Sequence, residues 1–308
     1  MFIEKRKFGK DIKYYLVYSY REKDKVNKFR RYLGKNLSKQ EIELSRNEAE
    51  KEISSLLDDL RIDIFNFVLT KNQIQKFNEI ESKIKIDHLQ IDWTKFTEEF
   101  VYNTNAIEGS TVSLDEVKEI IEHKKKPKDE EELEAKNVAK AVNYIMETKE
   151  NLSLELIKKL HKICFTGTKS FAGKLRDVEV VVRTSRGDIV HSGVPFRELD
   201  DHLNDLIEWY KGNKDKFRPL VLAAIIHNQF EHIHPFQDGN GRVGRLLLNF
   251  ILIKNKYPPM NIALEDRREY YSTLTEYSKN QNLKPTIEYL IKQYKKTLSE
   301  VTTKKKKM

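Results

Sequence analysis

The sequence has little of what secreted and membrane proteins need. Its one cysteine among 308 residues, Cys164, excludes an internal disulfide. No run approaches the roughly 18 apolar residues of a membrane span, and the first ten residues, MFIEKRKFGK, lack the apolar stretch of a secretory signal. We therefore expect a soluble, cytoplasmic protein without a membrane partner. Cys164 lies in the apolar run LHKICF, which favours a small core residue over a nucleophile.

The composition predicts a globular, mainly helical chain whose charge is uneven. Hydrophobic residues make up 39% of the sequence, which is enough for a core. Residues 1–40 hold 13 Lys and Arg against 4 Asp and Glu, and this net charge of +9 equals that of the whole chain. Such a segment is able to meet nucleic acid or an acidic partner, although a charged surface also serves solubility. The sequence shows no internal repeat.

The first residues predict a small basic β-meander that ends at residue 38. Residues 2–7, 12–20 and 25–33 are rich in aromatic and β-branched side chains and are separated by polar turns. Four tyrosines in this segment either form a stacking platform for bases or cover one face of the sheet: Tyr14, Tyr15, Tyr18 and Tyr20.

A helical connector is expected over residues 39–97. Ser38 begins a capping-box pattern, and apolar residues at helical spacing continue to about residue 83. The main domain is expected over 98–297, followed by a basic tail over 298–308 in which Lys304 to Lys307 are frayed. Its helices are predicted near 129–149, 153–165, 198–211, 218–233, 241–255, 266–280 and 285–300.

One β-hairpin interrupts this helical pattern. Val178 to Val182 and Ile189-Val190 are apolar and β-branched, and they flank the turn sequence Thr184 to Asp188. These two segments are either a hairpin that takes part in function or ordinary strands of the core.

The twelve residues His234 to Arg245, HPFQDGNGRVGR, concentrate groups that handle phosphate. Gly239 and Gly241 allow a turn whose N–H groups face an anion at the start of the following helix. Pro235 ends the preceding helix, which fixes His234 at a helix-to-loop junction, where a neutral imidazole is able to act as a general base. Phe236 would anchor the loop in the core, and Asp238 is able to hold Mg²⁺ through oxygen.

Two other interpretations of the sequence are weaker. His227, His232 and His234 resemble a zinc ligand set, but a five-residue step on a helix turns His232 away from His227. The segment Gly167 to Lys174 resembles a phosphate-binding P-loop, but it has five residues between its glycines instead of four, and Leu175 replaces the required Ser or Thr. We reject both.

The motif resembles the signature of the Fic (Fido) family, His-x-Phe-x-Asp/Glu-Gly-Asn-Gly-Arg-x-x-Arg, and every fixed position is met. The resemblance covers about residues 98–297 and implies a helical bundle with a hairpin flap. It also implies transfer of AMP from ATP, with Mg²⁺, to a hydroxyl of a protein side chain.

Carried over by position, the resemblance makes His234 the catalytic base and Asp238 the Mg²⁺ ligand. The nucleotide would be held by Asp238, Gly239, Asn240, Gly241, Arg242, Val243, Gly244 and Arg245, with both arginines on the outer phosphates. The flap would pair with an extended segment of the target protein through Val180, Val181, Val182 and Arg183. Tyr270 and Tyr271 match a tyrosine pair that lies beside the adenine in relatives.

A second motif, Thr104 to Gly109, matches the family's inhibitory pattern Ser/Thr-x-x-x-Glu-Gly/Asn and precedes the catalytic motif. The resemblance therefore implies an N-terminal inhibitory helix whose Glu108 occupies the arginine that would bind the γ-phosphate; the alternative is a surface glutamate. Relatives with this glutamate also remove AMP. An alternative function is a nucleic-acid-associated regulatory module with an ATP-sensing site. The sequence leaves the target protein and a homodimer open.

Overall fold

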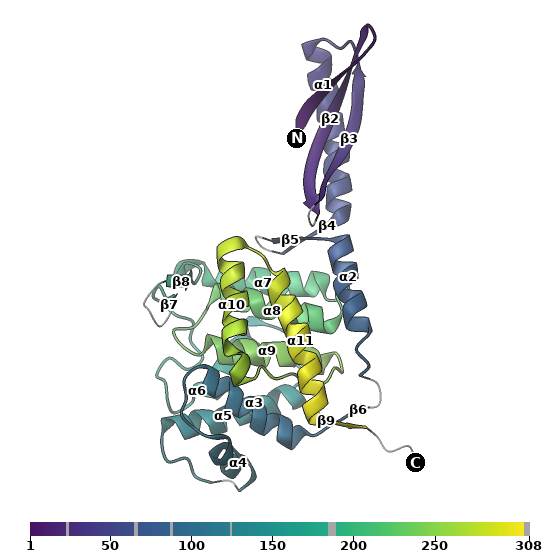
Figure 1. The fold of residues 1–308 in the computed structure, drawn as a ribbon. Coiled ribbons are helices and arrows are strands. Elements are labelled where there is room, and N and C mark those ends of the chain that lie inside the picture. Colours follow the sequence, from purple (N-terminus) through teal and green to yellow (C-terminus); the bar gives the residue numbers. More distant parts are fainter. Residues whose placement is uncertain (23–24, 65–66, 87–88, 124, 184–188, 305–308) are drawn as a thin grey trace. The chain divides into compact units, whose positions relative to one another are not determined.

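The computed structural model describes residues 1–22, 25–64, 67–86, 89–123, 125–183 and 189–304. The chain is mainly helical, as predicted, with a three-stranded sheet at its N-terminus (Figure 1). It divides into two compact units, Met1–Gln75 and Lys76–Met308. No helix in the described part of the chain has the length and hydropathy needed to cross a membrane.

The first unit is built around an antiparallel sheet in the order β1–β2–β3. Its strands are β1 (Phe2–Phe8), β2 (Asp11–Glu22) and β3 (Lys25–Lys35), which confirms the predicted meander. Helix α1 (Lys39–Leu60) lies along one face of this sheet (Figure 1). The core between them consists of Leu16, Ala49 and Ile53, with Ile3, Tyr18 and Leu33 packed against it.

The predicted continuous helix to residue 83 is wrong at residues 61–70. Strands β4 (Arg61–Ile64) and β5 (Phe67–Thr70) pair there as an antiparallel hairpin, and helix α2 (Lys71–Ser82) follows. The apolar residues of this segment are mostly β-branched or aromatic, which favours strands, and a short apolar run does not distinguish the two periods.

The end of the chain, where a basic tail is predicted over residues 298–308, has regular structure up to Lys304. Helix α11 (Lys284–Val301) runs to Val301, and β9 (Thr302–Lys304) pairs with β6 (Leu89–Ile91). The reason is burial, since Thr297 and Val301 are each 1% exposed. Residues 305–308 of the tail lie outside the described residues, as does the predicted turn Thr184 to Asp188.

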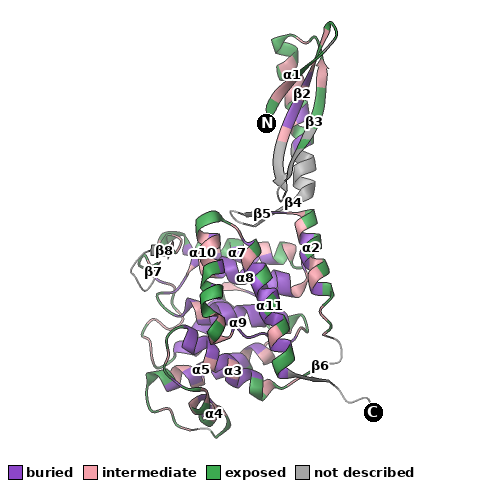
Figure 2. Ribbon diagram, viewed as in Figure 1, coloured by how far each residue is buried: buried purple, intermediate pink, exposed green. Residues whose placement is uncertain are grey.

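The second unit is a helical bundle around a central pair, α8 (Pro219–Ile233) and α9 (Asn240–Lys254), which is buried along most of its length (Figure 2). The predicted helices are confirmed to within a few residues. The elements around this pair are α3 (Trp93–Ile107), α4 (Leu114–Glu122), α5 (Glu130–Glu147), α6 (Leu154–Phe165), α7 (Leu199–Asn213), α10 (Arg267–Asn280), α11 and the hairpin β7 (Val181–Arg183) and β8 (Ile189–Ser192).

A buried carboxylate of α2 fixes the start of α8. Glu81 accepts hydrogen bonds from the N–H groups of Leu220 at 3.2 Å and Val221 at 3.0 Å. These donors have no acceptor within their own helix, and a negative charge is favourable at a helix N-terminus. Pro219 occupies the first helical position, where the absence of an N–H costs nothing. Because α8 carries His234 at its other end, this cap holds the helix that positions the motif.

We predict that Glu81→Ala lowers the free energy of unfolding by about 2 kcal/mol, because two buried N–H groups lose their acceptor. Urea unfolding followed by tryptophan fluorescence measures this in the second unit alone, since both tryptophans, Trp93 and Trp209, lie there. The matched control, Glu288→Ala on the exposed side of α11, is expected to change stability by less than about 0.5 kcal/mol. Equal effects of the two substitutions would contradict the capping role.

Candidate active site

The motif begins where α8 ends. His234 has left-handed backbone angles (φ 54°, ψ 60°), and its N–H still donates to the Phe230 carbonyl at 3.0 Å. This conformation is uncommon outside glycine and turns the chain sharply away from the helix axis. The Phe236 side chain is fully buried, as expected for the anchor of the loop.

The Asn240 side chain closes the loop between α8 and α9. Its Oδ1 accepts from the Phe236 N–H, and its Nδ2 donates to the Phe236 carbonyl, both at 2.8 Å. The amide therefore holds the loop closed, and its contact with a phosphate stays a prediction. The first N–H groups of α9 remain the donors that the helix itself does not use.

Two glycines are required because other groups approach their backbone closely. Gly239 has φ +82°, and a Cβ there would overlap the Phe165 ring. A Cβ on Gly241 would overlap the Glu108 carboxylate. The Gly-Asn-Gly turn thus gives Glu108 access to the start of α9.

A cavity of about 690 Å³ lies at this junction and brings together seven of the sixteen predicted site residues, from four separate segments of the chain. His234, Gly241 and Arg245 come from the motif, and Glu108 comes from the end of α3. Tyr271 is 40% exposed, whereas Tyr270 is buried with its hydroxyl 2.8 Å from Nε2 of His227. Val181, at the start of β7, also lines the cavity. Of the predicted hairpin strand, residues 178–180 precede β7 and are not part of it.

Arg245 is held by the segment that the inhibitory pattern singled out. Its guanidinium donates to Glu108 Oε1 at 2.6 Å, to Thr104 Oγ1 at 2.7 Å and to the Thr104 carbonyl at 3.0 Å. Arg245 is only 2% exposed. The Glu108 carboxylate supplies the countercharge that raises the pKa of Arg245 against the opposing effect of burial. Glu108 therefore stands where an anion bound to Arg245 would stand.

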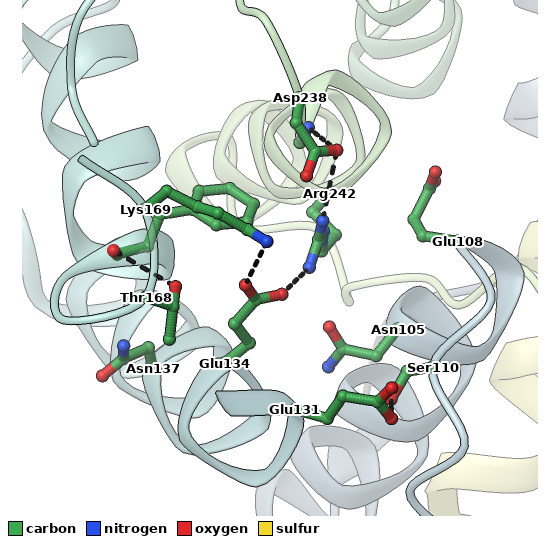
Figure 3. Close-up of polar contacts among 12 residues, drawn as sticks. Asn105, Glu108, Ser110, Glu131, Glu134, Asn137, Thr168, Lys169, Asp238 and Arg242 are labelled. Carbon is green, nitrogen blue, oxygen red and sulfur yellow. Dashed lines mark hydrogen bonds and ion pairs between the residues drawn. The ribbon is translucent and has the colours of Figure 1, made fainter. Parts of the chain in front are cut away.

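Arg242 points toward α5 (Figure 3), and its contact with the outer phosphates stays a prediction. One of its nitrogens bonds to Glu134 and another lies 3.5 Å from Asp238 Oδ1, while its guanidinium lies 4.4 Å from the centre of the Phe165 ring. Lys169 lies 3.7 Å from the same Glu134. Arg242 thus connects the motif loop to α5.

Comparisons with known proteins agree with this geometry. Residues 151–252 match the family model described as the Fic/DOC family. The chain contains a Fic/DOC domain. It is 28% identical over 207 residues to protein adenylyltransferase Fic of Nematostella vectensis, covering 64% of this chain and 47% of that protein. It is 30% identical over 203 residues to protein adenylyltransferase fic-1 of Caenorhabditis elegans, covering 63% and 39%. The chain thus spans less than half the length of these two curated relatives.

Solved structures have the same fold. A Fic domain containing signaling protein from Bacteroides thetaiotaomicron superposes with a TM-score of 0.61 at 25% identity, covering 74% of this chain and 94% of that one. A Fic-1 fragment from Caenorhabditis elegans gives a TM-score of 0.62 at 22% identity, covering 86% and 77%.

Three residues that the sequence did not single out hold the loop of this Fic domain. Arg176 donates to the carbonyls of His234 (2.8 Å) and Val178 (2.9 Å) and so ties the approach to the hairpin to the motif. The Gly173 N–H donates to Nδ1 of His161, so its Nε2 carries the proton and donates to the Asp238 carbonyl. The third residue is Glu134 of α5, which accepts a hydrogen bond from Arg242. Nothing in their local sequence signals these contacts, because their partners lie 58 to 108 residues away.

Glu231 was also missed, although it stands three residues before His234 on α8 and lines the same cavity. Its Oε1 is shielded from solvent without a hydrogen-bond partner among the described residues, and it lies where a Cβ on Gly244 would stand. Burial raises the pKa of Glu231 to about 8, against the opposing charge of Arg245. The spacing in the sequence was the available signal, because residues three apart on a helix are neighbours and Glu231 therefore lies beside His234.

The histidines of α8 contact different partners. His227 bonds to Tyr270, whereas His232 lies 5.0 Å from His191, ring centre to ring centre. Among the described residues no cluster of three His, Cys, Asp or Glu is arranged to hold a metal ion. Burial lowers the pKa of His234 to about 4, so its imidazole is neutral at pH 7. The buried Cys164 is a core residue, as expected.

We predict that Glu231→Gln stabilises the Fic domain increasingly as pH rises from 5 to 8. The folded protein keeps the Glu231 proton up to about pH 8, whereas the unfolded chain loses it near the ordinary value of 4.5, so folding becomes less favourable across this range. Glutamine does not ionise, and the difference is expected to reach roughly 2 to 4 kcal/mol. Urea unfolding of both proteins at several pH values measures it, and contributions of the histidines cancel. Parallel curves would contradict the buried neutral carboxyl.

Proposed function

We propose that the protein is an autoinhibited adenylyltransferase that transfers AMP from ATP to Ser, Thr or Tyr hydroxyls of a target protein and of itself. Two lines support this: the curated relatives are named protein adenylyltransferases, and one cavity contains His234 and Arg245 at the start of α9. The observation that carries the autoinhibition is the 2.6 Å ion pair between Glu108 and Arg245.

In this reaction His234 is the general base. Its Nδ1 lies 3.3 Å from the Glu231 carbonyl, which accepts only from a protonated nitrogen, so Nε2 is the basic atom. The target hydroxyl gives its proton to Nε2 as its oxygen bonds to the α-phosphorus, and the bond to the β-phosphate breaks in line, releasing pyrophosphate. The free N–H groups of the first turn of α9 stabilise the negative charge on the α-phosphate.

Asp238 fits the Mg²⁺ that this reaction implies. Its side chain is about half exposed, its Oδ1 is oriented by the Gly239 N–H at 2.6 Å, and Arg242 lies nearby. Mg²⁺ in nucleotide sites commonly takes one or two carboxylates and completes its shell with water and phosphate oxygens. Bound there, it would neutralise phosphate charge. This role needs Asp238 alone and agrees with the absence of a larger ligand cluster among the described residues.

We propose that the target pairs with β7. Within the described residues this strand pairs only with β8, so its other edge is available for an extended segment, and Val181 is 43% exposed beside the cavity. Val180, Val182 and Arg183 extend the same edge. Main-chain pairing brings a hydroxyl toward His234 without requiring a particular target sequence. The cytoplasmic location and a homodimer stay predictions.

Glu108→Gly is expected to raise AMP transfer by roughly 30-fold or more, because an anion no longer competes with the nucleotide for Arg245. Incubation with ATP and Mg²⁺ followed by mass spectrometry of the protein detects the added AMP. Glu108→Gln, which keeps the shape and removes the charge, is expected to give an intermediate rise. Unchanged activity in both variants would contradict autoinhibition.

A comparison of the unchanged protein with the Glu108→Gly variant also tests whether Glu108 takes part in AMP removal. Purified AMP-modified protein is incubated without ATP, and loss of AMP is followed. If Glu108 positions the hydrolytic water, the Glu108→Gly variant no longer removes AMP, whereas removal at the original rate would exclude this second role.

In the Glu108→Gly background, His234→Ala is expected to lower AMP transfer by about 10²- to 10⁴-fold, because the hydroxyl loses its base. ATP binding, measured by equilibrium dialysis, should change by less than about threefold, since His234 contacts the target hydroxyl in this mechanism and not the phosphates. Retained transfer would remove His234 from its role.

A further inference from the structure

The sheet of the first unit has one face that its own helix does not use. Alternate residues of a strand point to opposite faces. Leu16 and Ile3 pack against α1, and the strand register places their neighbours on the opposite side. We call this side the outer face; its described residues include Phe2, Glu4, Arg6, Asp11, Lys13, Tyr15, Val17, Lys28, Arg30, Tyr32 and Lys35.

The outer face is basic and aromatic, and it is exposed except at Val17, which is fully buried. Its cations are Arg6, Lys13, Lys28, Arg30 and Lys35, against the two carboxylates of Glu4 and Asp11, the second of which lies 3.2 Å from Lys35. The side chains of Arg6 and Arg30 are 42% and 38% exposed, and Phe2 and Tyr32 are 49% and 54% exposed. An ordinary solvated sheet face has no need of large exposed aromatic rings.

The aromatic and cationic groups of this face lie against one another. The rings of Tyr15 and Tyr32 lie 5.4 Å apart, centre to centre, on neighbouring strands. The Arg6 guanidinium lies 5.6 Å from the centre of the Tyr15 ring. Planar groups and fixed charges therefore share one continuous surface, whose flat elements are able to contact sugar and base edges while the cations meet phosphates.

The excess positive charge of the chain lies in the segment that forms this sheet. Residues 1–40 have a net charge of +9, and residues 41–308 have none, with 44 Lys and Arg against 44 Asp and Glu. Solubility alone does not require this excess charge to be concentrated in one short segment. Binding to a polyanion does require clustered positive charge, because phosphate neutralisation by Lys and Arg provides most of the affinity in nucleic-acid binding.

We propose that the outer face binds duplex DNA, with the sheet lying in the major groove. Three strands about 4.8 Å apart span about 10 Å between the outer two, which fits a major groove about 12 Å wide. The major groove of A-form RNA is too deep and narrow for such a sheet. Arg6 and Arg30, on opposite edge strands, are then in a position to contact phosphates on both sides of the groove.

Glu4 opposes this binding from within the face. It lies between the two arginines, 3.0 Å from Arg6 and 2.9 Å from Arg30. Exposed ion pairs of this kind contribute little to stability, so both arginines are able to exchange Glu4 for a phosphate at small cost. Removing the Glu4 charge should therefore tighten the complex, a result that a merely structural role of Glu4 does not give.

The test uses the full chain and a fluorescent 20-base-pair DNA duplex, with binding measured by anisotropy at several salt concentrations. Arg6→Gln/Arg30→Gln is expected to weaken binding by about tenfold or more and to reduce the log–log salt slope by about 2. The matched control, Lys5→Gln/Arg31→Gln, removes the same charge from the helix side of the sheet, where Arg31 pairs with Glu52 of α1, and should weaken binding by less than about threefold. Glu4→Gln should tighten binding several-fold.

Three outcomes would overturn the proposal: no duplex binding at low salt, equal losses in the two double variants, or tighter binding of single-stranded DNA or of duplex RNA. Circular dichroism and thermal unfolding of each variant check that the sheet is intact. AMP transfer measured in the Glu108→Gly background is expected to be the same with and without Arg6→Gln/Arg30→Gln. The DNA result is therefore independent of the proposed enzymatic activity.

Discussion

The geometry of the site depends on one side-chain amide. Asn240 bonds to both the N–H and the carbonyl of Phe236, and so it closes the connection between two helices that are themselves buried. A buried amide with both partners satisfied is stable only in one arrangement, since shifting either helix would leave polar atoms unpaired. This constraint keeps His234 at the end of α8 and leaves the first N–H groups of α9 open toward the cavity.

A site that binds a polyanion has to balance its own charge when it is empty. Arg245 and Arg242 are 2% and 6% exposed, and an unpaired charge at such depth is costly. Each therefore has a carboxylate partner, Glu108 for Arg245 and Glu134 for Arg242, but the two partners differ in position. Glu108 lines the cavity, so its contact competes with a ligand, whereas Glu134 comes from α5 and fixes the loop.

Burial also sets the protonation of the groups around this site. It lowers the pKa of His234 to about 4 and raises that of Glu231 to about 8, so that both side chains are neutral at pH 7. A neutral imidazole is what a general base requires, and a neutral carboxyl avoids repelling a nucleotide. The same low polarity that makes these groups neutral strengthens the attraction between Arg245 and any anion near it.

Much of this was determined by the sequence itself. The motif from His234 to Arg245 and the Glu108 pattern are local, because residue types at short spacing are enough to recognise them. The amphipathic helices follow from a 3.6-residue period of apolar residues, which needs no distant partner. The short apolar segment at residues 61–70 was misjudged because its spacing fits both a helix and a strand.

Only the tertiary structure decided which way the motif's side chains turn. Asn240 and Arg242 have hydrogen-bond partners within the protein, and Arg176, His161 and Glu134 reach the loop from distant segments. The physical reason is that a side chain's partner is set by packing between helices, which brings together residues far apart in the chain. Local sequence specifies the chemistry that is available, whereas packing specifies which of those groups faces the cavity.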